Sequence, residues 1–366
     1  MRDSESFPAA SVGIMLLLPL LIIMISPTRV NPDIGYFMDA GRRIYAGDLP
    51  YIDFFSENLL TIKYLYVLPV AIAEHVNFNA LSIWLLLNWI GMVASVACAY
   101  FLSTKIFARH GMPHLYWLFP LCISLISCLA LFTVDFGQRE HIFLLASLPW
   151  LLYRLCKLEG IAIHRLPAFC IGVAAGLAAT IKPHFLIVIV AVESFWLVRG
   201  NWYVRGKQII DPGFIGFLLF PIINVGYFIV FPDALQSLLN WIIPYVFFQR
   251  PDLLAGINVL SAIRLFFPLM ITSMILVFAI TARKRSETRL FEGLAVFSCA
   301  SGAIVLLQSM RLFYRLMPLY VGFFALCGLI FLLWNETDMQ KGRRAFLSGN
   351  FLFALVPVVV VFFMVL

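Results

Sequence analysis

The chain has 366 residues, of which 62% are hydrophobic and only 12% are charged. Soluble globular domains are closer to half apolar, so this composition excludes a soluble globule and indicates a protein that crosses a membrane several times. The formal net charge is +7. The basic residues lie in short links between apolar runs, which is typical of a membrane protein and argues against a nucleic-acid partner.

Eleven apolar runs are candidate spans, so we expect an all-α, polytopic transmembrane bundle with a single domain over residues 1–366. Some runs are shorter than the roughly 20 residues that cross a bilayer unaided. The first is followed by SPTRVNPD and not by a small-residue cleavage site, which favours a retained signal anchor. The runs cover residues 8–26, 80–102, 114–134, 141–156, 167–181, 184–198, 213–231, 257–281, 290–308, 315–334 and 346–366.

One long polar insertion, residues 32–63, follows the first run. Asn31 and Pro32 predict the start of a helix, and Gly47 predicts its end. Asp33 falls in the first turn, where the helix dipole favours an ionised carboxylate. The helix is expected to be amphipathic and to lie in a membrane interface. Its apolar face is Ile34, Phe37, Met38, Gly41, Ile44 and Tyr45, and its polar face is Asp39, Arg42 and Arg43.

The apolar run at residues 59–73 holds Lys63 and is short for a span. If it stays on the outer side and the N-terminus is inside, 16 of the 26 Lys and Arg residues lie in inner links. If it crosses, all but Arg2 of those face outward, against the positive-inside bias. We therefore predict a juxtamembrane helix. The outer side then receives residues 33–63, 134–141, 181–184, 232–256 and 308–315.

The outer segments carry charges at the ends of spans, where charges are costly unless they pair or meet a ligand. Residues 134–141 include Asp135, Arg139, Glu140 and His141. This turn is either a solvated loop with an Arg139–Glu140 pair or part of a site.

Two further outer segments carry cations that suit a phosphate. Lys182 and His184 flank Pro183, while Arg311 and Arg315 lie four residues apart on one helical face. The alternatives are a snorkelling lysine and general contacts with lipid headgroups. The aromatic-rich segment 234–249 could line a groove for a lipid tail.

The insertion also carries a resemblance. Asp33, Tyr36, Gly47, Pro50-Tyr51 and Asp53-Phe54-Phe55, followed by a Tyr-rich apolar helix, resemble the first external loop of GT-C glycosyltransferases, which include protein O-mannosyltransferases and lipid A aminoarabinose transferases. The resemblance covers about residues 26–184. It implies a first external loop at 27–79, the rest of a conserved module at 80–198 and variable spans at 199–366. Many relatives have two adjacent acids where this chain has Asp33 followed by Ile34.

The resemblance implies the roles of the site residues. Its loop-opening aspartate makes Asp33 the catalytic base, and Asp135 matches a second acid of the family. Asp53 is either a further carboxylate of the site or an organiser of its loop. A divalent cation, Mg or Mn, is left open, with Asp33, Asp135 and Glu140 as ligands. Donor phosphate is assigned to Lys182 and His184 and, from their helical spacing and not from the resemblance, to Arg311 and Arg315. Tyr51, Arg139, Glu140 and His141 are expected around the substrate.

We therefore expect an inverting glycosyltransferase of a bacterial inner membrane, with its active site facing the periplasm. It would move a sugar from a polyprenyl-phosphate donor to a lipid or glycan acceptor. Such a transfer needs a base for the acceptor hydroxyl and cations for the released phosphate. The alternatives are a lipid-linked sugar transporter or flippase and a non-catalytic partner in envelope-glycan assembly. Charges at one face and the lack of a visible repeat favour the enzyme over a transporter.

Overall fold

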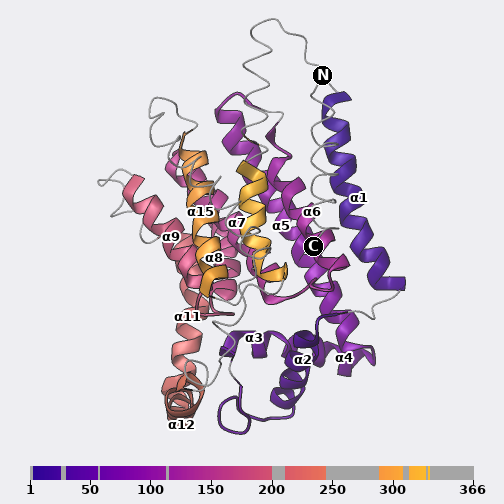
Figure 1. Cartoon of the computed structure of the whole chain (residues 1–366), viewed down its shortest axis with the longest axis vertical. Coiled ribbons are helices and arrows are strands. Elements are labelled where there is room, and N and C mark those ends of the chain that lie inside the picture. The colour runs from indigo at the N-terminus through magenta and orange to yellow at the C-terminus, as the bar shows by residue number, and fades with distance from the viewer. Residues whose placement is uncertain are drawn as a thin grey trace, which may run out of the picture.

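The structure is a computed structural model that describes residues 3–25, 30–56, 58–112, 115–199, 211–244, 288–307, 313–326 and 329. These parts are helical, apart from turns, loops and one isolated bridge between Pro50 and Phe54. Most helices form an upright bundle, and α2, α3 and α4 lie at one end of it (Figure 1). The helices are α1 (Asp3–Ile25), α2 (Pro32–Tyr45), α3 (Leu60–Leu65), α4 (Val67–Val76), α5 (Ala80–Arg109), α6 (Leu118–Phe132), α7 (Arg139–Leu158), α8 (Arg165–Ala179), α9 (Phe185–Arg199), α11 (Pro212–Val230), α12 (Pro232–Ser237) and α15 (Thr288–Leu307).

The expected all-helical membrane character is confirmed at a coarse level. Among the described residues, α5, α7 and α11 are long and apolar enough to cross a membrane. Shorter apolar helices occupy 9–25, 118–132, 165–179 and 317–326. The expected spans at 257–281 and 346–366 lie outside the described residues.

Helix α2 begins and ends where the local sequence predicts. The Asn31 side chain accepts a hydrogen bond from the Asp33 backbone N–H, Pro32 stands in the first turn, and Gly47 has a φ of 108° just beyond the last turn. The apolar face of α2 is buried, with Ile34 and Phe37 almost inaccessible.

That face differs from the expected membrane-interface face because it packs on protein. Phe37 contacts Tyr66 at the corner between α3 and α4, with ring centroids 5.5 Å apart. A Cβ added to Gly41 would lie 2.7 Å from the Tyr66 carbonyl oxygen. Helix α2 is thus docked on α3 and α4 through Ile34, Phe37, Met38 and Gly41, while Tyr45 at its end remains exposed.

The run at 59–73 does not cross the bundle. It is broken at Tyr66 into α3 and α4, which lie beside α2 at one end of the molecule (Figure 1). Lys63 in α3 is fully buried. The predicted juxtamembrane helix is therefore two short helices that, together with α2, form a cap on the bundle.

Close contacts hold the peripheral helix α11 against α8. A Cβ at Gly172 would lie 1.9 Å from the Gly213 carbonyl oxygen, and one at Gly176 would lie 2.1 Å from that of Phe217. Small residues four apart let two helix backbones approach in this way. The C-terminal part of α11 also contacts the cap and the loop before it. Asn224 donates to the Thr61 hydroxyl at 2.7 Å, and Tyr227 donates to the Pro50 carbonyl at 2.8 Å.

The end of the bundle opposite the cap carries its own charge network. Arg154 in α7 donates to Glu193 in α9 and to Asp211 at the start of α11, both at 2.8 Å. Asp211 also caps α11 by accepting from the Phe214 N–H at 2.7 Å. The network joins three helices. Each of its charged groups has an opposite charge as partner, so none of them is free for a ligand.

Candidate functional site

Asn31 joins the first loop to the turn between α6 and α7. Its backbone N–H donates to the Val134 carbonyl at 2.9 Å, and its side-chain amide donates to the Asp135 carboxylate at 3.0 Å. The same side chain caps the Asp33 N–H at 3.1 Å. One amide group thus binds the backbone of Asp33 and the carboxylate of Asp135, and the sequence predicts only the first of these contacts.

Both loops at this junction contain strained backbone. Tyr51 has a φ of 69° and Val134, a β-branched residue, has a φ of 61°. Such conformations are costly for residues other than glycine, and they gather at functional sites where the surroundings enforce them. The two positions flank the predicted carboxylates of each loop.

Arg139 at the start of α7 pairs with Asp33, with Nη2 and Oδ2 2.7 Å apart. Its Nη1 donates to the Asn58 side chain, and its guanidinium lies over the Phe37 ring at 4.9 Å from the centroid. The Nε–H has no partner among the described residues. The side chain of Asp33 remains 41% exposed, so the carboxylate is reachable while its arginine is nearly buried.

Glu140 pairs with Lys182 across the turns before α7 and α9. The expected alternative of an Arg139–Glu140 pair is therefore wrong, because each of these residues finds an opposite charge on a distant segment. Burial lowers the pKa of Lys182 to about 8, while the Glu140 carboxylate opposes that shift. Lys182 is consequently neutralised by Glu140 and is not an isolated phosphate ligand.

Arg315 and His184 belong to the same electrostatic neighbourhood. Arg139 and Arg315 both act on Lys182, and all three cations act on His184, whose pKa falls to about 3, mainly through burial. At neutral pH His184 is therefore an uncharged hydrogen-bonding group. Arg311 lies outside the described residues.

Asp135 is buried in the turn, with 5% of its surface exposed. Burial raises its pKa to about 6, the hydrogen bonds from Asn31 and Thr133 oppose the shift, and the charges of Glu140 and Asp33 add to it. Asp33 and Asp135 thus lie in contrasting surroundings. The first is an ion-paired, accessible carboxylate, and the second is an acid that titrates close to neutral pH.

His141 is buried within the turn. Its Nδ1 accepts the Gly137 backbone N–H at 3.2 Å, which places the ring proton on Nε2 and lets that nitrogen donate to the Ser127 hydroxyl at 3.0 Å. Both ring nitrogens are occupied by protein groups. The expectation that His141 faces the substrate therefore gives way to a role in holding the α6–α7 turn against α6.

Lys63 is a residue that the sequence analysis did not assign to the site. Its Nζ has no hydrogen-bond partner among the described residues and lies 3.4 Å from the centroid of the Tyr51 ring. Burial lowers its pKa to about 6. In the sequence, its place in the short apolar run at 59–73 bears only on whether that run crosses the membrane.

Asp53 organises its own loop. Its carboxylate accepts the Leu49 N–H at 2.7 Å, and its carbonyl accepts from Arg43 at 3.0 Å. This geometry supports the organiser alternative over a catalytic one. Tyr51, two residues earlier, is buried, and its hydroxyl donates to the Asn58 carbonyl at 2.7 Å.

The segment expected to line a lipid groove is described only as far as residue 244. Its Ala234 and Ile242 are buried in a small cluster with Tyr51, Leu60 and Tyr227. The described part of this segment therefore supports the loop around Tyr51.

The donor set does not favour a metal. Asp33 and Glu140 are each paired with a cationic side chain, and Asp135 with an amide. Within the described ranges there is no group of three or more His, Cys, Asp or Glu residues that could hold a metal ion.

Comparisons of the chain with protein-family models, with curated proteins and with solved structures found no match.

Proposed function

We propose that the chain is a polytopic membrane glycosyltransferase of the GT-C type that transfers a sugar from a polyprenyl phosphate to a lipid or glycan hydroxyl. The observation that carries the proposal is the Asp33–Arg139 ion pair, which joins the loop-opening carboxylate to the turn holding Asp135 and Glu140. It brings an accessible carboxylate and a partly unsatisfied arginine together at one end of the bundle.

Asp33 serves as the general base in this proposal. The Oδ2 atom of Asp33 already accepts a hydrogen bond from Arg139, so loosening of Arg139 would free that oxygen for the acceptor's proton. A donor phosphate can compete for Arg139, because the Nε–H of Arg139 lacks a partner in the described structure and a phosphate accepts two arginine N–H groups at once. Binding of the donor phosphate to Arg139 would thereby free Asp33 for the acceptor.

The transfer step balances as a single displacement. The acceptor hydroxyl gives its proton to the Asp33 carboxylate while its oxygen bonds to the anomeric carbon. The bond from that carbon to the phosphate oxygen breaks, and its electron pair leaves with the polyprenyl phosphate. The anomeric configuration inverts. Arg139 stabilises the leaving phosphate, since a preorganised cation in a dry site acts strongly on developing charge. Lys63 adds a second positive charge once opening of the Tyr51 loop relieves the burial that lowers its pKa.

The remaining assignments have supporting roles. Glu140 orients Lys182 beside the phosphate, Arg315 adds positive charge, and His184 offers a neutral hydrogen bond. Asp135 holds Asn31, which aims Asp33. The proposal also includes the finer topology: the eleven-span bundle in a bacterial inner membrane, with the cap facing the periplasm, as the positive-inside bias favours.

The test is mass spectrometry of envelope glycans and polyprenyl-phosphate sugars from cells with and without the protein. We expect one glycan to lack a sugar when the protein is absent and one lipid-linked sugar to accumulate. A lipid-linked sugar that accumulates on the inner leaflet alone would instead identify a flippase. An unchanged glycan and lipid profile would contradict the enzyme.

A further inference from the structure

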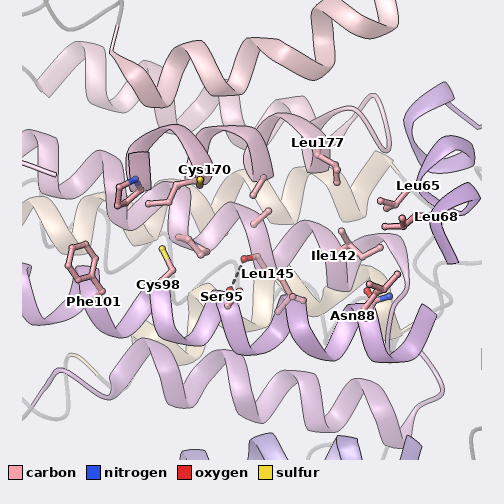
Figure 2. A pocket seen from close by; sticks show the side chains of 18 of the residues that line it. Leu65, Leu68, Asn88, Ser95, Cys98, Phe101, Ile142, Leu145, Cys170 and Leu177 are labelled. Carbon is pink, nitrogen blue, oxygen red and sulfur yellow. Dashed lines mark hydrogen bonds between the residues drawn. The ribbon is translucent and has the colours of Figure 1, made fainter. Parts of the chain in front are cut away.

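A long apolar groove runs along the bundle between α5, α7 and α8, with the ends of α3 and α4 at one extremity. Its volume is about 710 Å³, and its walls are almost wholly apolar. Figure 2 shows Phe101 at one end and Leu65, Leu68 and Asn88 at the other.

The groove follows one face of α5. Its lining residues there recur every three or four positions from Trp84 to Phe101, and its middle is bordered by the small residues Gly91, Ala94 and Ser95. At 1.5 Å per residue this stripe is roughly 25 Å long. One leaflet of a bilayer offers only about 15 Å of hydrocarbon. The groove is therefore longer than the depth that the chains of an ordinary bilayer lipid fill.

The wall stays apolar although a proline interrupts it. Pro149 in α7 cannot donate to the carbonyl of Leu145, which is left without its helical partner. The Ser95 hydroxyl of α5 donates to that carbonyl at 2.6 Å, as the dashed line in Figure 2 marks. Because Ser95 satisfies the carbonyl that Pro149 leaves free, the wall of the groove presents no unpaired polar group here to a chain lying in it.

One end of the groove is continuous with the candidate site. Trp84 and Asn88 line that end, and a Cβ at Gly137 would lie 2.9 Å from the indole nitrogen and 3.1 Å from the amide nitrogen of these residues. Gly137 belongs to the same turn as Asp135 and immediately precedes the residues that lead into Arg139. A lipid that lies in the groove with its head at this end would have its phosphate beside this turn.

We infer that the groove binds the single long chain of a polyprenyl-type lipid whose phosphate is held at the site. The inference rests on the proposed function and deepens it by naming where the donor's chain lies. Its length favours an isoprenoid chain over the acyl chains of phospholipids.

The test measures binding without transfer. The probes are a long-chain polyprenyl monophosphate and geranyl phosphate, each titrated against purified protein in detergent. Gly91 faces the groove with only Leu145 at 3.9 Å from an added Cβ, so Gly91→Trp would fill the channel. Ile90→Trp is the matched control, because Ile90 is next to Gly91 in the sequence but is half exposed and does not line the groove.

We expect Gly91→Trp to weaken long-chain binding by at least about tenfold, which corresponds to about two methylene groups losing their burial. Geranyl phosphate should bind the parent, Gly91→Trp and Ile90→Trp equally. Thermal unfolding of each variant checks that the bundle is intact. Parent-like long-chain binding by an intact Gly91→Trp would overturn the inference while leaving the proposed function standing. A parent that binds polyprenyl phosphate no better than a diacyl phospholipid would overturn the proposed donor itself.

Discussion

Arg139 is the residue that connects the two parts of the candidate site. Its guanidinium contacts Asp33 of α2 and Asn58 of the following loop while α7 holds its backbone. Asp33 lies 106 residues and Asn58 lies 81 residues from Arg139 along the chain. A sequence signals that a charge at a span end needs a partner, but it does not say which of several distant carboxylates will supply one.

Lys63 should make the stability of the protein depend on pH. Burial sets its folded pKa near 6 against 10.5 in an exposed lysine. The folded state therefore binds fewer protons than the unfolded state between these values, and stability rises as pH increases from 6 to 10.5. Lys63→Met should abolish this rise and should stabilise the protein at pH 6 by about 1–3 kcal/mol, the cost of an unsatisfied buried donor.

The same variant should bind polyprenyl phosphate more weakly, by about tenfold or more, if a charge-assisted hydrogen bond is lost. Lys105→Met is the control, because Lys105 also lies over an aromatic ring, at 4.9 Å from Phe101, but near the opposite end of α5. Denaturation in detergent across pH measures the first effect and lipid titration the second. A Lys63→Met protein that is more stable yet binds the phosphate normally would remove Lys63 from the site.

At the scale of the elements, local sequence signals were sufficient for α2. The Asn31–Pro32 start and the Gly47 end are short-range features, and the structure has them as predicted. The apolar face was also predicted, but its partner was not, because an amphipathic pattern is the same whether lipid or protein covers it. The break at Tyr66 that creates this partner has a local cause in Pro69, which stands in the first turn of α4 and cannot donate to the carbonyl of Leu65 at the end of α3.

Two glycines of α2 provide a matched test of this docking. A Cβ at Gly41 would meet the Tyr66 backbone at 2.7 Å, whereas nothing lies within 4 Å of one at Gly35. Gly41→Ala should destabilise the protein by about 1–3 kcal/mol through overpacking. Gly35→Ala should stabilise it by about 0.5–1 kcal/mol, because alanine favours a helix interior.

Transfer should also fall in Gly41→Ala, since α2 carries Asp33, and should be unchanged in Gly35→Ala. Thermal unfolding and transfer assays on equal amounts of membrane protein measure both effects. Equal stability in the two variants would mean that α2 does not dock closely on the corner at Tyr66.

At the scale of the whole molecule, the charge pattern predicted which loops share an end. The turns that hold Asp135 and Lys182 meet the first loop, through Asn31 and through Thr61 with Thr180 at 3.0 Å. At the other end, Arg109 and Arg289 both approach Glu159. The groove was not predictable from the sequence, because the small residues that form it come from separate helices, with no pattern to pair them.

The proposed orientation has a direct test. Glu74 is exposed on α4 in the cap, and His164 is exposed in the link before α8 at the opposite end. Glu74→Cys should react in intact cells with a membrane-impermeant thiol reagent, and His164→Cys should react only after permeabilisation. The parent protein, with its native cysteines, gives the background. The reverse labelling pattern would place the site in the cytoplasm and contradict a periplasmic transferase.

The central claim is that the whole bundle positions one carboxylate to deprotonate an acceptor. Asp33→Asn has the same size, and the Asn31 cap on its backbone N–H is unaffected, so the protein should fold and insert normally. The amide cannot take the proton, and loss of a general base typically slows a reaction by about 10²- to 10⁴-fold. Transfer in membranes with matched protein levels should fall by that order while polyprenyl-phosphate binding persists. Transfer by Asp33→Asn at near the parent rate would contradict the account.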